Sequence, residues 1–314
     1  MDAGIIIQVV LLLVGFLFLI KGSDFFVDGA SSIASILKIP TIIVGLTIVA
    51  FGTSAPEAAV SITSSLAGNN AMAVSNVIGS NLFNMLMVIG VSALLGDLLM
   101  EKKVLDKDLP FLVGITILWA VFIIVGWDVT NIEGIILLLI LVAYIVLLIR
   151  GARKSSDANE VEKPKLTLPK SIIFMLIGLA GIIIGGDLVV DSASAIAIAF
   201  GMSETLVGLT IVAIGTSLPE LVTSLTALKK GENQLVIGNV IGSNIFNILF
   251  VLGASSAISA IPLDSSLLTD VLFMLGVTIL CFIFGKTQEK YDKKEGIILV
   301  TLFVVYMAFA ILRN

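Results

Sequence analysis

Gly52-Thr53-Ser54-Ala55-Pro56-Glu57 recurs 163 residues later as Gly215-Thr216-Ser217-Leu218-Pro219-Glu220. A second segment recurs at the same offset: Asn76-Val77-Ile78-Gly79-Ser80-Asn81-Leu82-Phe83-Asn84 returns as Asn239-Val240-Ile241-Gly242-Ser243-Asn244-Ile245-Phe246-Asn247. Each copy places a glutamate inside a long apolar run, where a carboxylate is costly and usually functional. Two such carboxylates beside a helix-breaking proline indicate an ion site at the interface between two repeats.

The composition is that of a polytopic membrane protein. Hydrophobic residues make up 58% of the chain and charged residues 13%, and the mean hydropathy is +1.15. A soluble domain carries roughly 25% charged residues. The first apolar run has no basic n-region or small-residue cleavage site, so we interpret it as a membrane span and not as a signal peptide. No basic patch suggests nucleic-acid binding, and no protein partner is evident.

Ten apolar runs are long enough to cross a membrane. Sixteen of the eighteen Lys and Arg residues fall on one side of the resulting topology. The positive-inside rule places that side in the cytoplasm and both termini outside the cell membrane. The predicted runs are 4–36, 41–67, 71–95, 108–126, 131–149, 171–199, 205–228, 234–261, 266–284 and 296–312.

Each repeat contains five of these spans, and five is an odd number. The second copy therefore enters the membrane in the opposite direction, as in transporters built from inverted repeats. The predicted fold is an all-α polytopic membrane protein with ten transmembrane helices, arranged as two inverted five-helix repeats. The first repeat covers residues 1–149, with its motifs at about 41–95. The second covers 171–314, with its motifs at about 204–258, and residues 150–170 form a polar cytoplasmic linker.

The prolines are expected to break the helices near the middle of the membrane. Glu57 lies about 16 residues, or roughly 24 Å, beyond the start of its span. Pro56 has no N–H and its ring clashes with the carbonyl four residues earlier, so that carbonyls near the break become available as ligands. The backbone carbonyls freed in the two copies are those of Ala50, Gly52, Thr53, Ala213, Gly215 and Thr216.

The converging groups are nearly all oxygen donors. The chain has no histidine and one cysteine, Cys281, so a zinc, copper or iron site is not expected. Oxygen ligands select hard cations. The two glutamates balance one Ca²⁺, and several Na⁺ could compete for the same oxygens, which is a simple basis for exchange. A structural role for the carboxylates and a cation channel remain alternatives. The chain has no nucleophile–base pair or nucleotide motif, so we do not expect an enzyme.

The two pairs of motifs resemble the α-repeats of the sodium/calcium exchangers, in the calcium/cation antiporter superfamily. The resemblance covers the core of both halves. It implies that helices two, three, seven and eight form the ion-binding core, and that helices one and six slide across it. The transported ions would be Ca²⁺ and Na⁺, in a lipid membrane and without a cofactor. Proton-coupled calcium exchangers of the superfamily are the alternative, although their motif around the glutamate differs.

The resemblance also assigns the site residue by residue. Glutamates and serines of the motifs bind the ions, as do backbone carbonyls of the motif threonines and of the alanines three residues before them. One departure is that some relatives, including potassium-dependent ones, have aspartate where this chain has Asn247. With asparagine at both equivalent positions, K⁺ cotransport is not expected. The candidate ligands are Glu57, Glu220, Thr53, Thr216, Ser54, Ser217, Ser80, Ser243, Asn84, Asn247, Ala50 and Ala213.

Overall fold

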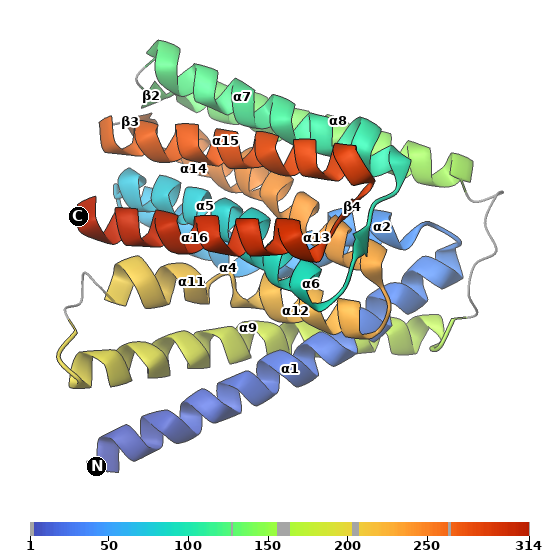
Figure 1. Ribbon diagram of the computed structural model, residues 1–314, viewed down its shortest axis with the longest axis horizontal. Coiled ribbons are helices and arrows are strands. Elements are labelled where there is room, and N and C mark those ends of the chain that lie inside the picture. The colour runs from blue at the N-terminus through green and yellow to red at the C-terminus, as the bar shows by residue number, and fades with distance from the viewer. Residues whose placement is uncertain (1–2, 127, 156–163, 203–206, 263–264, 314) are drawn as a thin grey trace.

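The computed structural model is built almost entirely from helices (Figure 1). It describes residues 3–126, 128–155, 164–202, 207–262 and 265–313. Within these ranges eight helices are long and apolar enough to cross a membrane, or nine when one bent pair is counted as a span. The predicted all-helical membrane fold is confirmed. The count of ten stays a prediction, because the predicted span 205–228 begins outside the described residues.

Six of the predicted spans are long helices. Their bounds agree with the predicted runs to within a few residues, except that α8 and α9 extend into the predicted linker from both sides. Residues 156–163, in the middle of that linker, lie outside the described residues. The six helices are α1 (Ala3–Leu37), α7 (Leu109–Gly126, preceded by the π-turn η3, Val104–Asp108), α8 (Asn131–Ser155), α9 (Leu168–Ala199), α15 (Ser265–Gln288) and α16 (Lys293–Arg313).

The helices that carry the two glutamates are broken beside them, as the prolines predict. Pro56 and Pro219 lie in the first turn of the helix that follows each break, where a missing N–H leaves no hydrogen bond unmade. In the first copy, the helix axis bends by 49° between Thr53 and Ala55. This copy consists of α2 (Thr41–Val44), η1 (Gly45–Val49), α3 (Ala50–Thr53) and α4 (Ala55–Leu66); the second consists of η4 (Gly208–Val212), α11 (Ala213–Gly215) and α12 (Leu218–Lys229).

The asparagine-containing motifs lie on the two most buried spans. In each, an α-helix passes into a π-helical turn that begins at the last asparagine of the motif, Asn84 or Asn247. Such turns are rare and often occur at functional sites. The segments are α5 (Asn70–Phe83), η2 (Asn84–Val88) and α6 (Ile89–Leu95), and α13 (Asn233–Phe246), η5 (Asn247–Leu252) and α14 (Gly253–Ile258).

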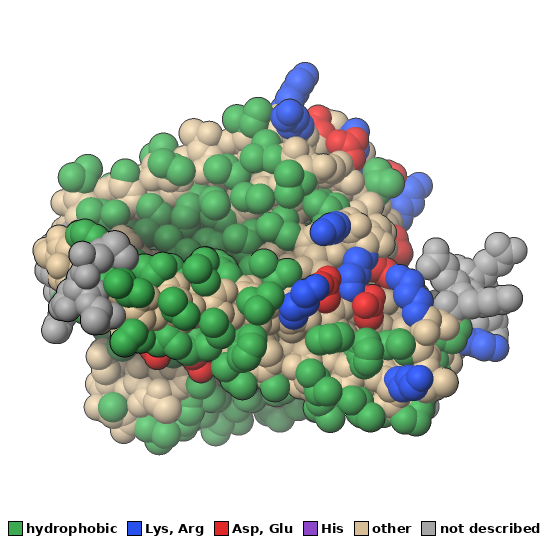
Figure 2. Space-filling view, turned by 90° about the horizontal axis from the view of Figure 1, so that it is seen from below, with side chains coloured by type: hydrophobic (Ala, Val, Ile, Leu, Met, Phe, Trp, Pro, Cys, Tyr) green, Lys and Arg blue, Asp and Glu red, His purple; other side chains and the backbone are tan. Residues whose placement is uncertain are grey.

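Helices α1 and α9 lie side by side along one edge of the molecule and run antiparallel (Figure 1). Glycines bring their backbones together: a Cβ atom on Gly22 would lie 2.8 Å from the carbonyl oxygen of Gly178. Small residues allow this kind of close approach between membrane helices. Figure 2 shows the outer face of this pair, which carries many hydrophobic side chains. Leu13, Leu17 and Ile177 are among the exposed hydrophobic residues of the two helices. This pair is therefore tightly joined and apolar on its outer side.

Two short antiparallel strand pairs join segments that are far apart in the sequence. Strand β1 (Leu98–Leu99) pairs with β4 (Lys290–Tyr291), and β2 (Asp128–Val129) pairs with β3 (Ile261–Pro262). The pairs lie at opposite ends of the helices (Figure 1). Beside the first pair, Lys290 donates to Asp97 over 2.6 Å, and this hydrogen bond raises the pKa of the lysine. Each end of the molecule thus links the first part of the chain to the second.

We predict that Gly22→Val separates α1 from α9 and destabilises the protein by about 1–3 kcal/mol, the range found for overpacking. The added side chain would collide with backbone atoms of Gly178 and Ile182, which cannot turn aside as a side chain can. The measurement is the thermal unfolding midpoint of the detergent-purified protein. The control is Gly4→Val in the same helix, because a Cβ atom on Gly4 would meet nothing within 4 Å. An equal effect of both substitutions would contradict the prediction.

Candidate cation-binding site

The two motif glutamates are completely buried and are held by hydroxyl groups from both copies of the repeat. Ser217 donates to Oε1 of Glu57 over 3.1 Å, and Ser54 donates to Oε1 of Glu220 over 2.9 Å. These two bonds cross between the copies. They hold the carboxylates close together, because each serine lies only three residues before the glutamate of its own copy and donates to the glutamate of the other copy. The structure therefore brings together the two carboxylates that the sequence predicts to share a site.

A serine of the second motif completes the set around each carboxylate. Ser80 donates to Oε1 of Glu57, and Ser243 donates to Oε1 of Glu220, each over 3.4 Å. In each glutamate, both serine hydroxyls donate to the same carboxylate oxygen, Oε1. The other oxygen, Oε2, is buried and has no hydrogen-bond partner among the described residues. One carboxylate oxygen of each glutamate is thus available to a cation.

Both glutamates lie in the first turn of a helix, α4 or α12. The N-terminus of a helix carries a partial positive charge and stabilises a nearby carboxylate. This helps a buried pair of carboxylates to persist in an apolar interior, but a helix end does not neutralise two full charges. A cation between them would do so.

The two motif threonines differ in their surroundings. The hydroxyl of Thr53 lies 3.0 Å from Oδ1 of Asn239, to which it donates, and 3.3 Å from the hydroxyl of Ser243. The hydroxyl of Thr216 is buried and has no partner among the described residues. The sequence predicts equivalent roles for these residues, yet of the two hydroxyls only that of Thr216 has no hydrogen-bond partner among the described residues.

The carbonyl of Ala50, a predicted ligand, accepts the backbone N–H of Ser54 over 3.0 Å. Ser243 also approaches this carbonyl, at 3.5 Å. In the second copy Ser217 N–H bonds to Ile214 instead of to Ala213, the residue equivalent to Ala50. Ala50 thus already carries one backbone hydrogen bond at the break, and the pattern of bonds differs between the copies.

Asn84 and Asn247 each keep their amide oxygen free. The Nδ2 group of Asn84 donates to Oδ1 of Asn244, and the Nδ2 group of Asn247 donates to Oδ1 of Asn81, both over 3.1 Å. The Oδ1 atoms of Asn84 and Asn247 are buried and have no partner among the described residues. Both residues are predicted ligands, and these oxygens are of the right kind for that role.

Two further asparagines belong to the site, although sequence reasoning did not select them. Asn76 donates to the backbone carbonyl of Glu57 over 3.2 Å and to Ser61 over 2.9 Å. Asn239 makes the equivalent bonds to Glu220 and Ser224, over 3.4 and 3.0 Å. These bonds fix the rotation of each glutamate helix. Their position in the sequence could have indicated a role, because each asparagine is the first residue of the repeated motif.

Five of the thirteen buried side-chain atoms that have no hydrogen-bond partner among the described residues belong to the predicted ligands. They are Oε2 of both glutamates, Oδ1 of Asn84 and Asn247, and the Thr216 hydroxyl oxygen. A buried acceptor without a partner costs free energy, so five of them on residues of one hydrogen-bonded site call for a ligand. All five are hard oxygen donors, which suit Na⁺ and Ca²⁺. No group of three or more His, Cys, Asp or Glu residues that could hold a metal is found in the described ranges. The negative charge of this set therefore comes from Glu57 and Glu220 alone.

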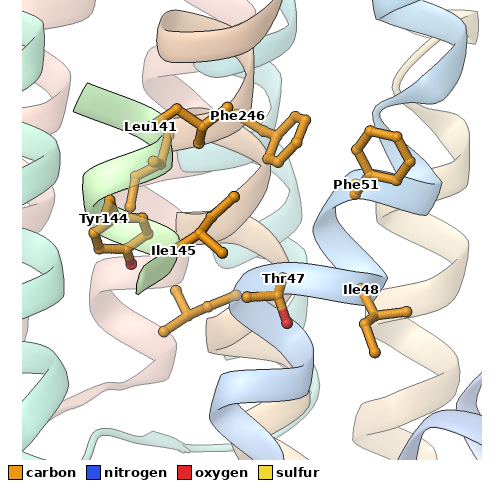
Figure 3. A pocket seen from close by; sticks show the side chains of 9 residues that line it. Thr47, Ile48, Phe51, Leu141, Tyr144, Ile145 and Phe246 are labelled. Carbon is orange, nitrogen blue, oxygen red and sulfur yellow. The ribbon is translucent and has the colours of Figure 1, made fainter. Parts of the chain in front are cut away.

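A cavity of about 370 Å³ beside η1 is chemically different from this site. Figure 3 shows its lining, in which Phe51 and Phe246 face side chains of α8 such as Leu141 and Ile145. The hydroxyl of Tyr144 belongs to the lining and donates to Asp108 over 3.1 Å. The rest of the lining is almost entirely apolar, so this cavity does not suit a cation.

A second cavity, of about 220 Å³, lies against the motif glycine Gly215 and is lined by Val189 and Val190 of α9. At the repeat-related glycine, Gly52, the buried ring of Phe26 lies 2.9 Å from where a Cβ atom would be. Phe26 and Val189 occupy equivalent positions, 163 residues apart. The two breaks therefore have different neighbours, Phe26 beside Gly52 and the valines of α9 beside Gly215.

The comparisons with known proteins agree with this geometry. The family described as "Sodium/calcium exchanger protein" matches residues 7–150 and 170–312. The chain is 39% identical to the putative antiporter CaxA of Alkalimonas amylolytica, over 96% of this chain and 98% of that protein. It is 30% identical to the sodium/calcium exchanger MaX1 of Methanosarcina acetivorans, over 96% and 98% of the two chains. A solved structure of the sodium-calcium exchanger NCX_Mj superposes with a TM-score of 0.87 at 30% identity, covering 98% of this chain and 99% of that one. This chain belongs to the sodium/calcium exchanger family.

Proposed function

We propose that this protein exchanges Na⁺ for Ca²⁺ across the membrane by alternating access, with Glu57 and Glu220 as the charged ligands. The observation that carries the proposal is the pair of buried carboxylates, each held through one oxygen and each with its second oxygen unpartnered. One Ca²⁺ or a set of Na⁺ ions balances the same two charges. Competition for one site couples the two ion flows without requiring a second binding site.

Neutralisation of the carboxylates would link ion binding to movement. Two bare carboxylates cannot pass an apolar surface without a large desolvation cost. With a cation bound, the apolar surfaces of α1 and α9 can move across the core. Because α1 and α9 are joined through glycines, we expect them to move as one body. Inward flow of Na⁺ would then drive Ca²⁺ out, and transport is electrogenic if more positive charge enters than leaves.

The architecture that we propose is ten helices in two inverted five-helix halves, 1–149 and 171–314. Both termini would be extracellular, and the 150–170 linker cytoplasmic. The clustering of Lys and Arg toward one end of the face in Figure 2 supports this orientation. The crossed bonds from Ser54 to Glu220 and from Ser217 to Glu57 support the pairing of the two halves about one site.

We expect the remaining ligands to be neutral oxygens. The candidates from side chains are Ser54, Ser217, Ser80, Ser243, Asn84, Asn247 and Thr216, and those from the backbone are Ala50, Thr53, Ala213 and Thr216. Because Asn84 and Asn247 carry no charge, the site has two negative charges and not three. This favours Na⁺/Ca²⁺ exchange over a K⁺-dependent exchange, which in this family is associated with an aspartate at the position of Asn247.

We predict that Glu57→Gln and Glu220→Gln each reduce Na⁺-driven Ca²⁺ uptake by on the order of a hundredfold, because the charge count of a site sets its Ca²⁺ affinity. Glutamine keeps the shape and the acceptor for the serine hydroxyls but removes one negative charge. The measurement is ⁴⁵Ca²⁺ uptake into proteoliposomes loaded with Na⁺ and diluted into Na⁺-free buffer. Glu101→Gln, which lies outside the site, is the control and should transport normally.

The same vesicles distinguish this function from the proton-coupled alternative. Wild-type vesicles that carry a pH gradient but no Na⁺ gradient should take up no ⁴⁵Ca²⁺. Uptake driven by the pH gradient alone would mean proton/cation exchange at the same carboxylates. Robust Na⁺-driven ⁴⁵Ca²⁺ uptake by both glutamine variants would show that the two glutamates are not the charged ligands.

An ion pair ties α1 to the glutamate-bearing helix α12 at one end of the molecule. Nζ of Lys230, at the C-terminus of α12, lies 2.9 Å from Oδ2 of Asp28 and 3.5 Å from Oδ1 of Asp24. It also donates to the backbone carbonyl of Asp24 over 2.7 Å. The repeat-related position holds Ala67, which cannot form an ion pair. In the proposed orientation this contact lies at the cytoplasmic end of both helices, so we expect it to favour outward access.

We predict that Lys230→Gln raises the apparent Ca²⁺ affinity at the cytoplasmic face relative to the outer face by about twofold to fivefold. The lysine is partly exposed, and such ion pairs contribute about 0.2–1 kcal/mol. The measurement compares Ca²⁺ activation in inside-out and right-side-out membrane vesicles. Lys229→Gln, at an exposed neighbouring position on the same helix, is the matched control. An unchanged ratio for Lys230→Gln would show that this contact does not bias access.

A further inference from the structure

The amide groups of Asn84 and Asn247 can bind a cation only in one of their two orientations. An asparagine amide has an acceptor side and a donor side, which have nearly the same shape. Only the oxygen can bind a cation, and an N–H group directed at the cation would repel it. A buried asparagine is therefore preorganised as a ligand when another group fixes which side of its amide faces the ion.

In this protein that group is an asparagine from the other copy of the motif. Asn84 donates its Nδ2 to Oδ1 of Asn244, and Asn247 donates its Nδ2 to Oδ1 of Asn81. All four side chains are at most 2% exposed. If the amide of Asn84 were turned by 180°, its oxygen would face the oxygen of Asn244. Two buried acceptors would then oppose each other, which is unfavourable.

The orientation of Asn244 is itself fixed by the backbone. Its Nδ2 donates to the carbonyl oxygen of Asn81 over 3.4 Å. A backbone carbonyl within a helix has a fixed direction and can only accept. The amide of Asn244 must therefore place its oxygen toward Asn84, and Asn84 must place its own oxygen away from Asn244. That oxygen is one of the unpartnered buried atoms described above.

We propose that Asn81 and Asn244 are positioning residues, which direct the amide oxygens of Asn247 and Asn84 toward the transported cation. Neither is assigned as a ligand. The proposal rests on the proposed cation site at Glu57 and Glu220. In this proposal, the specificity of the site for cations depends partly on two residues that do not touch the ion. Each of these asparagines accepts a hydrogen bond from a ligand in the opposite copy and so fixes its orientation.

The test is the effect of Asn244→Leu in two backgrounds. With Asn84 present, loss of the acceptor lets its amide turn, and we expect Ca²⁺ affinity to fall about tenfold, the loss that one misdirected polar group causes. In an Asn84→Ala background, position 84 has no amide to orient. There Asn244→Leu should change Ca²⁺ affinity by less than about twofold, because orientation no longer matters. The probe is Ca²⁺ itself, measured by equilibrium ⁴⁵Ca²⁺ binding to the detergent-purified full chain.

A similar fall in affinity in both backgrounds would overturn the proposal, since it would mean that Asn244 acts through general packing. An unchanged affinity for Asn244→Leu with Asn84 present would overturn it as well. The control is Asn70→Leu, a buried asparagine of α5 that bonds to Ser259 and Ala260, and it should leave Ca²⁺ affinity unchanged. If Asn244→Leu does not fold, Asn81→Leu with and without Asn247→Ala tests the same relation in the other copy.

Failure of the proposed function would be seen separately. If the wild type binds Ca²⁺ but shows no Na⁺-driven flux, the exchange reaction is wrong while the affinities of the variants still decide the role of Asn244. If the wild type binds no Ca²⁺ at millimolar concentration, both the site and the positioning role are overturned. If Asn244→Leu lowers Ca²⁺ affinity only when Asn84 is present, the proposal is supported.

Discussion

The burial of two carboxylates side by side in an apolar interior is the constraint on which the rest of this structure depends. Glu57 and Glu220 have no exposed surface. Leaving two unpaired charges there would cost several kcal/mol per ion, so the surrounding helices are arranged to reduce that cost. The helix breaks place both residues at helix N-termini, and four serines donate to them. This compensation is incomplete, because each glutamate keeps one unpartnered oxygen. The incomplete compensation makes the site suitable for a cation.

The hydrogen bonds around the carboxylates also explain why the two motifs of each copy are needed together. The first motif supplies the glutamate and the break, while the second supplies the asparagine that holds the backbone carbonyl of the same glutamate. Serines and asparagines then cross to the opposite copy. A single copy would have half of the charges and only some of the donors. The site therefore exists only where the two copies meet, which accounts for their near identity in residues that face it.

Much of the fold could be predicted from the sequence because the membrane restricts what the backbone can do. Apolar runs gave most spans to within a few residues, and Pro56 and Pro219 gave the positions of the breaks. The π-helical turns at Asn84 and Asn247 could not be predicted, because they depend on packing and on hydrogen bonds between distant helices. Nor does the sequence indicate that α8 continues as far as Ser155, since the polar residues there resemble a linker.

The candidate site was predicted as a set of residues but not as a set of atoms. Repetition selected the glutamates, serines and asparagines, and chemistry selected oxygen. Neither distinguishes an engaged hydroxyl, such as that of Thr53, from a free one, such as that of Thr216. The difference arises because Asn239, on α13, bonds to Thr53, whereas Thr216 has no partner among the described residues. Identical motifs thus acquire different surroundings once they fold together, because hydrogen bonds between distant helices decide which groups of a motif are engaged.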